Sequence, residues 1–186
     1  LGELAETRDH QGVVARVAPF PYADAYALAK AEKALLAVLD RVTDPRNLGA
    51  VIRSAAAFGA SGVVIPQRRA AGVTAATWKT SAGAAARLPV AQAVNLVRAL
   101  KAYQQAGCFV VGLAGEGDTD LAAAAKDFLS GPAVIVVGSE GEGLSRLVRD
   151  TCDVVARINI DSATESLNAS VATSIALYEA AKARRG

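Results

Sequence analysis

Short apolar runs recur along this chain of 186 residues, and helical spacing of apolar residues follows several of them. The clearest runs are ALLAVLDRV at 34–42, GVVIP at 62–66, CFVVGLA at 108–114 and PAVIVVG at 132–138. Strands that are apolar on both sides are typical of a parallel sheet whose two faces are both covered by helices. The sequence therefore predicts an α/β fold with a mostly parallel sheet and helices on both faces.

The remaining segments predict the other elements and the domain limits. Apolar spacing predicts a helix over 47–58, which Gly59 and Gly62 end. Residues 1–32 carry turn signals and are interpreted as an arm or linker with one short helix over 24–33, so the domain is expected to span 33–186. Further helices are expected over 75–86, 93–105, 145–150 and 166–185, and further strands over 88–91 and 153–160.

The composition leaves the partner open. Twenty Lys and Arg residues against 18 Asp and Glu give a net charge of +2, which permits an RNA partner without indicating one. No apolar stretch approaches the roughly 20 residues of a membrane helix, and no signal-peptide pattern is present. Cys108 and Cys152 fit no metal-ligand spacing, and the apolar run around Cys108 favours a buried structural thiol. We therefore expect a cytoplasmic protein with no membrane partner and no metal site.

Polar segments follow three of the predicted strands. They are Thr43–Gly49 with Arg53 in the helix beyond it, Gly138–Leu144, and Ser162–Ser170. Ligands of open α/β sheets bind outside the carboxyl ends of the strands, so these segments are the candidates for a functional site.

The glycine-rich segment indicates its ligand by the charges that it carries. Glu140 and Glu142 would repel a phosphate, and the chain has neither the GxxxxGK pattern of phosphate loops nor a GxGxxG motif opening a helix after the first strand. A cationic, hydroxyl-rich ligand fits better, and S-adenosylmethionine carries both a sulfonium and a ribose. A tight turn with solvated glutamates explains the same residues equally well.

The other candidate side chains also have two interpretations each. Asn47 is favoured as a helix cap, and Ser166 can cap the last helix. Asn168 can instead present its amide to a ligand. Arg53 interrupts a helix of small apolar residues, so its guanidinium either binds an anion such as an RNA phosphate or lies on an exposed face.

In this order the segments resemble the three motifs of the SpoU/TrmH family of RNA ribose methyltransferases. The first motif is DRVTDPRNLGAVIRSAAAFGASGVVIP at 40–66, the second VVGSEGEGLSRLV at 136–148 and the third ESLNASVATSIALYEA at 165–180. The resemblance runs from Leu35 to the C-terminus. The segments 9–22 and 78–90 look most like the bacterial branch that methylates a guanosine of 23S rRNA.

The resemblance implies transfer of a methyl group from S-adenosylmethionine to a ribose 2′-hydroxyl of RNA, without a metal. It assigns the catalytic roles to Asn47, Arg53, Glu140, Ser166 and Asn168, and cofactor binding to Gly138, Ile158 and Leu167. Because a guanidinium stays protonated, we expect Arg53 to orient the hydroxyl and stabilise alkoxide charge while a phosphate or another group takes the proton.

The resemblance also implies an architecture and an assembly. It implies a deep C-terminal trefoil knot, which is a rare exception among folds, and a homodimer with its active site near the subunit interface. In the same branch an RNA-binding domain precedes the arm. The chain has no Met and begins at Leu1, so we expect it to be a piece of a longer protein that lacks this domain.

One segment departs from the family. Where the family has Ile-Pro-Met and then a glycine two residues later, this chain has Ile158-Asn159-Ile160-Asp161-Ser162. The change removes a fixed φ and adds an N–H donor at Asn159, and it restricts the turn at Ser162. The change supports one alternative, a catalytically silent RNA-binding or dimerisation module. A tRNA- or adenosine-directed methyltransferase is another alternative, because such relatives share the same motifs. A nucleotide-phosphate enzyme is disfavoured by the two glutamates.

Overall fold

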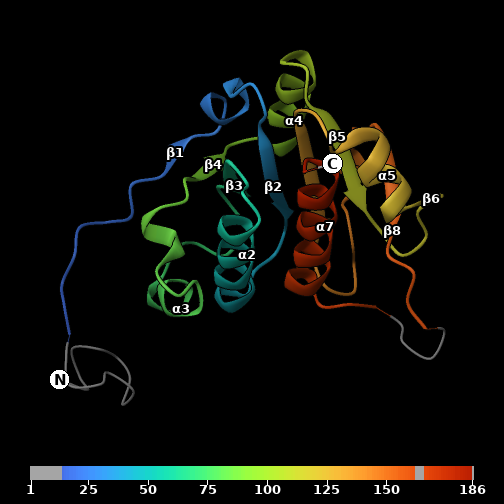
Figure 1. The fold of residues 1–186 in the computed structure, drawn as a ribbon. Coiled ribbons are helices and arrows are strands. Elements are labelled where there is room, and N and C mark those ends of the chain that lie inside the picture. The colour runs from blue at the N-terminus through green and yellow to red at the C-terminus, as the bar shows by residue number, and fades with distance from the viewer. Residues whose placement is uncertain (1–13, 162–165, 186) are drawn as a thin grey trace.

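The structure, a computed structural model, describes residues 14–161 and 166–185. Its centre is one sheet of eight strands in the order β1-β4-β3-β2-β7-β5-β8-β6, and every strand pairing in it is parallel (Figure 1). This confirms the predicted parallel α/β fold. The strands are β1 Ala23–Asp24, β2 Leu35–Asp40, β3 Gly62–Pro66, β4 Val90–Ala93, β5 Phe109–Leu113, β6 Thr119–Asp120, β7 Ala133–Gly138 and β8 Val154–Arg157.

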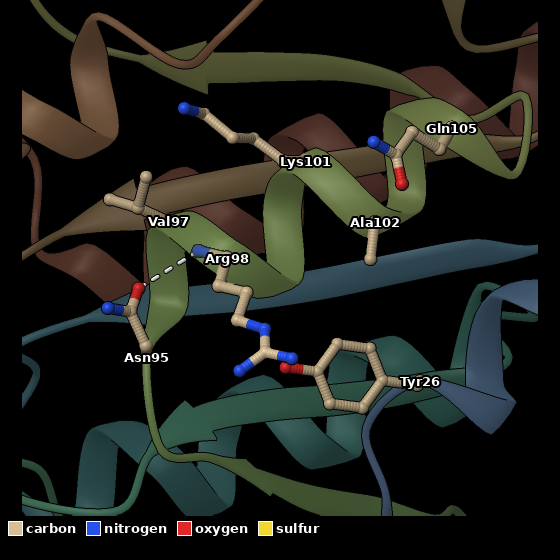
Figure 2. A pocket seen from close by; sticks show the side chains of 7 residues that line it. All are labelled: Tyr26, Asn95, Val97, Arg98, Lys101, Ala102 and Gln105. Atoms are coloured by element: carbon tan, nitrogen blue, oxygen red, sulfur yellow. Dashed lines mark hydrogen bonds between the residues drawn. The ribbon is translucent and has the colours of Figure 1, made fainter.

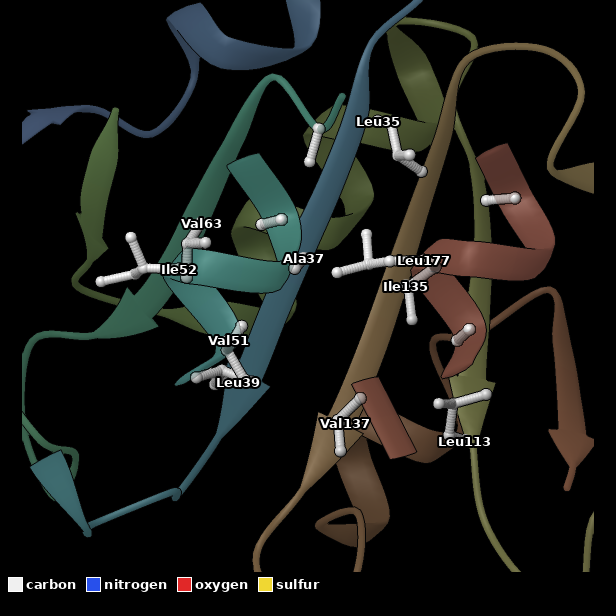
Figure 3. Packing of buried hydrophobic residues seen from close by; sticks show 14 of the residues in the cluster. Leu35, Ala37, Leu39, Val51, Ile52, Val63, Leu113, Ile135, Val137 and Leu177 are labelled. Atoms are coloured by element: carbon white, nitrogen blue, oxygen red, sulfur yellow. The ribbon is translucent and has the colours of Figure 1, made fainter. Parts of the chain in front are cut away.

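Helices cover both faces of the sheet, as the apolar strands predict. They are α2 Pro45–Ala57, α3 Ala75–Thr80, α4 Leu96–Gln105, α5 Leu121–Phe128, α6 Arg146–Arg149 and α7 Ala169–Ala183, with the 3₁₀ helices η1 Ala27–Lys30 and η2 Ala84–Ala86. Alternate residues of β2 enter two separate cores. Leu35 and Leu39 pack beneath α2 and α7 (Figure 3), whereas Leu36 and Val38 pack against α4 on the other face. A strand with no solvent face needs apolar residues at every position, which explains the unbroken runs.

Several elements differ from the sequence prediction. Helix α5 was not expected, because its sequence LAAAAKDF has few large apolar residues to show helical spacing. The expected helix over 75–86 is divided into α3 and η2 by positive φ angles at Ala82 and Gly83. Helix α7 begins at Ala169 rather than at residue 166, since the side chain of Asn168 is the cap.

Part of the segment predicted as an arm packs onto the sheet. Strand β1 pairs with β4, and Ala25 and Ala29 are buried in the core beneath α4. The hydroxyl of the buried Tyr103 donates to the carbonyl of Ala25 at 3.0 Å. The expected helix over 24–33 is only the single 3₁₀ turn η1.

The strand order has a switch point between β2 and β7. From β2 the chain continues to β3 and β4 on one side, while β7, β5 and β8 lie on the other. Asp40 at the end of β2 is in register with Gly138 at the end of β7. In open α/β sheets this crevice is where ligands bind, and two of the three polar segments begin there.

We predict that Arg184 is a major source of stability at the opposite ends of the strands, where the chain enters the central strands β2 and β7. Its guanidinium donates to the carbonyl oxygens of Lys33 at 2.7 Å, Leu129 at 2.8 Å and Ala34 at 3.0 Å, and also to that of Gly131. Arg184→Ala leaves these acceptors without their charged donor, so the free energy of unfolding should fall by about 2–3 kcal/mol. Denaturant unfolding measures this loss. Arg185→Ala, a substitution at the neighbouring exposed residue, is the control. A loss of unfolding free energy as large as that of Arg184→Ala would contradict the prediction.

Candidate functional site

A glycine loop folds back on the end of β7. Ser139 pairs with Gly143 in an isolated bridge, where the N–H of Gly143 donates to the carbonyl of Ser139 at 2.9 Å. Gly141 and Gly143 have φ angles of 80° and 65°, which only glycine adopts without strain. A Cβ on Gly138 would lie 2.0 Å from the carbonyl carbon and oxygen of Gly143. Gly138 is therefore required by the close approach of the loop, in addition to lining the cavity described below.

The end of β2 holds this loop in place. The buried carboxylate of Asp40 accepts from the N–H of Ser145 at 2.6 Å. Arg41, at a φ of 61°, donates to Glu142 at 2.7 Å and to the carbonyl of Gly143 at 3.4 Å. Sequence reasoning missed both residues as loop anchors. The only signal was a charged pair closing an otherwise apolar strand.

Three of the predicted site residues meet in one polar cluster. The side-chain amide of Asn47 donates to Oε1 of Glu140 at 2.9 Å. The amide of Asn168 donates to the same oxygen at 2.5 Å and to Oδ1 of Asn47 at 3.0 Å. The cluster therefore joins the segments that follow β2, β7 and β8. No described residue contacts Oε2 of Glu140 through a hydrogen bond or ion pair.

Asn47 and Asn168 have different local roles. Asn47 is not the cap of α2, contrary to the favoured interpretation, because Asp44 accepts from the N–H of Arg46 and Pro45 opens the helix. This frees the Asn47 amide for Glu140. Asn168 does cap α7, since its Oδ1 accepts from the N–H of Ser170 at 2.9 Å while its Nδ2 donates into the cluster.

Helices α2 and α7 lie side by side and keep the cluster in register (Figure 1). About two turns beyond the Asn47–Asn168 contact, the hydroxyl groups of Ser174 and Ser54 are hydrogen-bonded at 2.7 Å. Farther along, the rings of Phe58 and Tyr178 meet edge to face at 5.7 Å. Contacts at three levels therefore fix the two helix starts relative to each other.

A cavity of about 480 Å³ opens beside the cluster at the carboxyl ends of β5, β7 and β8. Its walls combine the glycine loop with apolar side chains from β5, from β7, from the chain after β8 and from the segment that leads into α7. All three predicted cofactor-binding residues, Gly138, Ile158 and Leu167, line it, and so do Glu140 and Ser166. Ser166 lies before the helix and not at its cap.

A further carboxylate, which sequence reasoning did not identify, also lines this cavity. Glu116 follows β5 and forms an ion pair with Arg149. A backbone hydrogen bond, and then the Arg149 side chain, hold the pKa of Glu116 below its ordinary value. Together with Glu140 and Glu142, it makes three carboxylates among the described residues that line the cavity. Glu116 and Glu142 are paired with Arg149 and Arg41, whereas no described residue forms an ion pair with Glu140, and this unpaired carboxylate favours a cationic ligand over a phosphate.

Arg53 lies apart from this arrangement. Its side chain is exposed on α2, and it does not line the cavity. No described residue forms an ion pair or hydrogen bond with its guanidinium. Within one chain, the structure therefore joins Asn47, Glu140 and Asn168 but leaves Arg53 outside their cluster.

The segment that departs from the family forms a polar clasp beside the cavity. Arg157 donates to the carbonyl of Gly117 at 2.8 Å and to Oδ1 of Asn159 at 3.2 Å. Asn159 in turn donates to Asp120 at 2.5 Å, whose other oxygen accepts from the N–H of Ala122 at the start of α5. The clasp ties the chain after β8 to the loop after β5. Ser162, the other departure, lies outside the described residues.

Cys108 is buried, as predicted, and burial raises its pKa as well as that of Cys152, the latter to about 12. Residues 14–161 and 166–185 contain no group of three or more His, Cys, Asp or Glu side chains arranged to hold a metal ion. In the same ranges no helix has the length and apolar character needed to cross a membrane.

Comparisons with known proteins agree with this fold and these motifs. The SpoU rRNA Methylase family matches residues 34–178. A relative from Mycobacterium sp. (strain KMS), called an uncharacterized tRNA/rRNA methyltransferase, is 55% identical over 192 residues, covering 100% of this chain and 60% of the relative. The AdoMet-bound rRNA methyltransferase from Sinorhizobium meliloti superimposes with a TM-score of 0.79 at 31% identity, covering 87% of this chain and 61% of that one. A crystal structure of an RNA 2′-O ribose methyltransferase superimposes with a TM-score of 0.74 at 30% identity, covering 84% of this chain and 58% of that one.

The chain belongs to the SpoU rRNA methylase family, because the match covers most of its length. It spans about 60% of the length of the curated relatives that it matches.

Proposed function

We propose that this chain binds S-adenosylmethionine in the cavity beside the glycine loop and transfers the methyl group to a ribose 2′-hydroxyl of RNA. The observation that carries the proposal is the Asn47–Glu140–Asn168 cluster, built from all three family motifs at the rim of that cavity. The AdoMet-bound structure from Sinorhizobium meliloti and the 2′-O ribose methyltransferase structure support the cofactor and the acceptor atom.

The cavity suits S-adenosylmethionine in size and in chemistry. About 480 Å³ lies within the range of cavities that hold drug-sized ligands. Leu113, Ile158 and Leu167 offer apolar contacts for a base, and the glycine loop offers backbone groups. The rim carboxylates suit a ligand with a sulfonium and an ammonium group. When bound, S-adenosylmethionine supplies an activated methyl group on a cationic sulfur.

The residues of the cluster would orient the reactants. Asn47 and Asn168 hold Oε1 of Glu140, which fixes the carboxylate and directs its second oxygen away from them. A fixed carboxylate stabilises positive charge beside it without reorganisation. Ser166, which lines the cavity next to Leu167, would add a hydroxyl donor for the ligand.

We predict a measurable contribution of the Asn159 clasp to cofactor affinity. Asn159→Ala removes the hydrogen bonds to Asp120 and Arg157, so the cavity wall formed by Ile158 and Ile160 loses its tie to the loop after β5. The Kd for S-adenosylmethionine should rise about three- to ten-fold. Calorimetric titration checks this. Asn159→Asp, which sets a carboxylate against Asp120, should weaken binding further, and unchanged affinity in both variants would contradict the prediction.

We further propose that the active enzyme is a homodimer in which Arg53 acts at the subunit interface. Arg53 is exposed on α2, and the adjacent α7 exposes 46% of Val171 and 50% of Tyr178. Exposed apolar side chains next to a polar site are typical of an interaction surface. Arg53 would orient the ribose hydroxyl and stabilise the negative charge that develops on its oxygen.

Arg53→Ala is expected to lower methyl transfer about ten-fold or more without changing the Kd for S-adenosylmethionine. The reason is that Arg53 lies outside the cofactor cavity, while a charge-assisted hydrogen bond to the acceptor would be lost. Initial rates and calorimetry on the same preparations measure the two quantities. Equal rates for Arg53→Ala and the wild type would remove Arg53 from the mechanism.

We also propose the target nucleotide, an additional RNA-binding domain and the C-terminal knot. The resemblance of 9–22 and 78–90 supports a guanosine of 23S rRNA as the target, and an additional RNA-binding domain next to residues 1–32 fits the family branch. The C-terminal trefoil knot is proposed on the same basis. The chain path through 162–165, on which the knot depends, lies outside the described residues.

Incubation with methyl-labelled S-adenosylmethionine and 23S rRNA, followed by digestion to nucleosides, tests the activity and its target. The proposal expects the label in 2′-O-methylguanosine. Label in another 2′-O-methylnucleoside, or only with tRNA, would replace the target and keep the reaction. Cofactor binding without transfer to any RNA would favour the catalytically silent module.

A further inference from the structure

A second cavity lies on the other face of the sheet, between α4 and Tyr26, the residue before η1 (Figure 2). Its volume of about 490 Å³ is close to that of the cofactor cavity. We call it the α4 cavity. It is lined by Tyr26, Asn95, Val97, Arg98, Lys101, Ala102 and Gln105.

The lining of the α4 cavity is cationic. Arg98 and Lys101 stand one helical turn apart, and neither has an ion-pair partner among the described residues. None of the described residues that line the cavity carries a carboxylate, although the whole chain has 20 cationic and 18 anionic side chains. The nearest acidic residue in sequence to Tyr26 is Asp24, whose carboxylate accepts from the N–H of Tyr26 at 2.8 Å. The cavity therefore has a local excess of positive charge that the overall composition does not reveal.

An aromatic ring and amide groups complete the lining. Tyr26 is 44% exposed, and Figure 2 shows the Arg98 guanidinium reaching toward the hydroxyl end of its ring while Lys101 projects from the next turn. The backbone next to Tyr26 is fixed, because the carbonyl of Ala25 accepts from the buried Tyr103. Oδ1 of Asn95 caps α4 through the N–H of Arg98 at 2.9 Å, so its Nδ2 is the group left for a ligand.

We propose that the α4 cavity is a second RNA contact, in which Arg98 and Lys101 hold one or two phosphates of a single strand and Tyr26 stacks on an adjacent base. Cations beside an exposed aromatic ring are the usual elements of single-strand recognition. The inference rests on the proposed function for its choice of ligand. It also answers a need of that function, since the carboxylates of the cofactor cavity repel the phosphates of the same RNA.

Fluorescence anisotropy with a labelled single-stranded RNA of about 12 nucleotides tests this proposal over a range of salt concentrations. The variant Arg98→Ala/Lys101→Ala is compared with Lys126→Ala/Arg185→Ala, which removes the same charge from exposed positions outside both cavities. The cavity variant should bind about ten-fold more weakly than this control. Its plot of log affinity against log salt should be shallower by at least about 0.7, the value for one phosphate of a single strand.

The stacking contact is tested separately. Tyr26→Leu should weaken binding by about five-fold or more with an unchanged salt slope, whereas Tyr26→Phe should bind like the wild type. Calorimetry with S-adenosylmethionine accompanies every variant, so a failure of the cofactor site is distinguished from a failure of the α4 cavity. The proposal is overturned if the cavity variant and the charge-matched control bind alike, or if the wild-type chain does not bind this RNA at low salt.

Discussion

Asn168→Asp is expected to lower methyl transfer by about 10²-fold or more, while the stability of the fold stays near that of the wild type. The substitution keeps the side-chain oxygen that caps α7, because aspartate and asparagine cap helices equally well. It replaces the Nδ2 donor, which binds Glu140 and Asn47, with an anionic oxygen. Two carboxylates would then face each other, and the cluster would separate or take up a proton.

Asn168→Ala gives the matched comparison. It loses the same donor and also the cap, so its activity should be equally low and its free energy of unfolding about 1 kcal/mol lower than that of the aspartate variant. Initial rates and denaturant unfolding of both variants measure the two effects. Activity of Asn168→Asp within a few-fold of the wild type would show that the cluster has no part in the reaction.

Gly138→Ala is expected to abolish detectable binding of S-adenosylmethionine, with a loss of about 1–3 kcal/mol in the free energy of unfolding. The new Cβ would lie 2.0 Å from the backbone of Gly143, and backbone atoms cannot move aside as a flexible side chain can. The glycine loop must therefore leave β7, which separates Glu140 from Asn47 and opens the cavity wall.

Gly131→Ala is the control for this substitution. A Cβ at Gly131 meets no atom within 4 Å, so the same change of residue should leave cofactor binding intact. Calorimetry and thermal unfolding are measured on both variants. If the Gly138→Ala variant bound the cofactor as tightly as the Gly131→Ala variant, the glycine loop would not form the cofactor site.

Much of the fold could be predicted because its strands have no solvent face. The runs that form β2 and β7 are apolar up to the last residue of each strand, and this pattern identifies a covered parallel sheet. Helix α5 could not be found from apolar spacing, since its buried face is made largely of alanines. A cap at Asp120 followed by four alanines was the signal available, because alanine is the strongest helix former.

The sequence identified the residues of the candidate site better than it identified the contacts between them. The rule that ligands bind at strand ends indicated the segments that carry Asn47, Glu140 and Asn168, and the family resemblance selected these residues. Their mutual hydrogen bonds depend on the strand order, which no local pattern specifies. The contact between Asp40 and Ser145 joins residues 105 positions apart for the same reason. The cap role favoured for Asn47 was wrong because Asp44-Pro45 is the stronger start signal.

Calorimetric titration of the chain with S-adenosylmethionine tests the central claim most directly, with S-adenosylhomocysteine, ATP and NAD titrated in parallel. The described residues at the ends of β5, β7 and β8 line the cavity with three carboxylates, and the sequence has no GxxxxGK phosphate loop, so the first two ligands should bind saturably and the last two should not. Binding of neither S-adenosylmethionine nor its demethylated product, or equal binding of ATP, would contradict the assignment of this cavity.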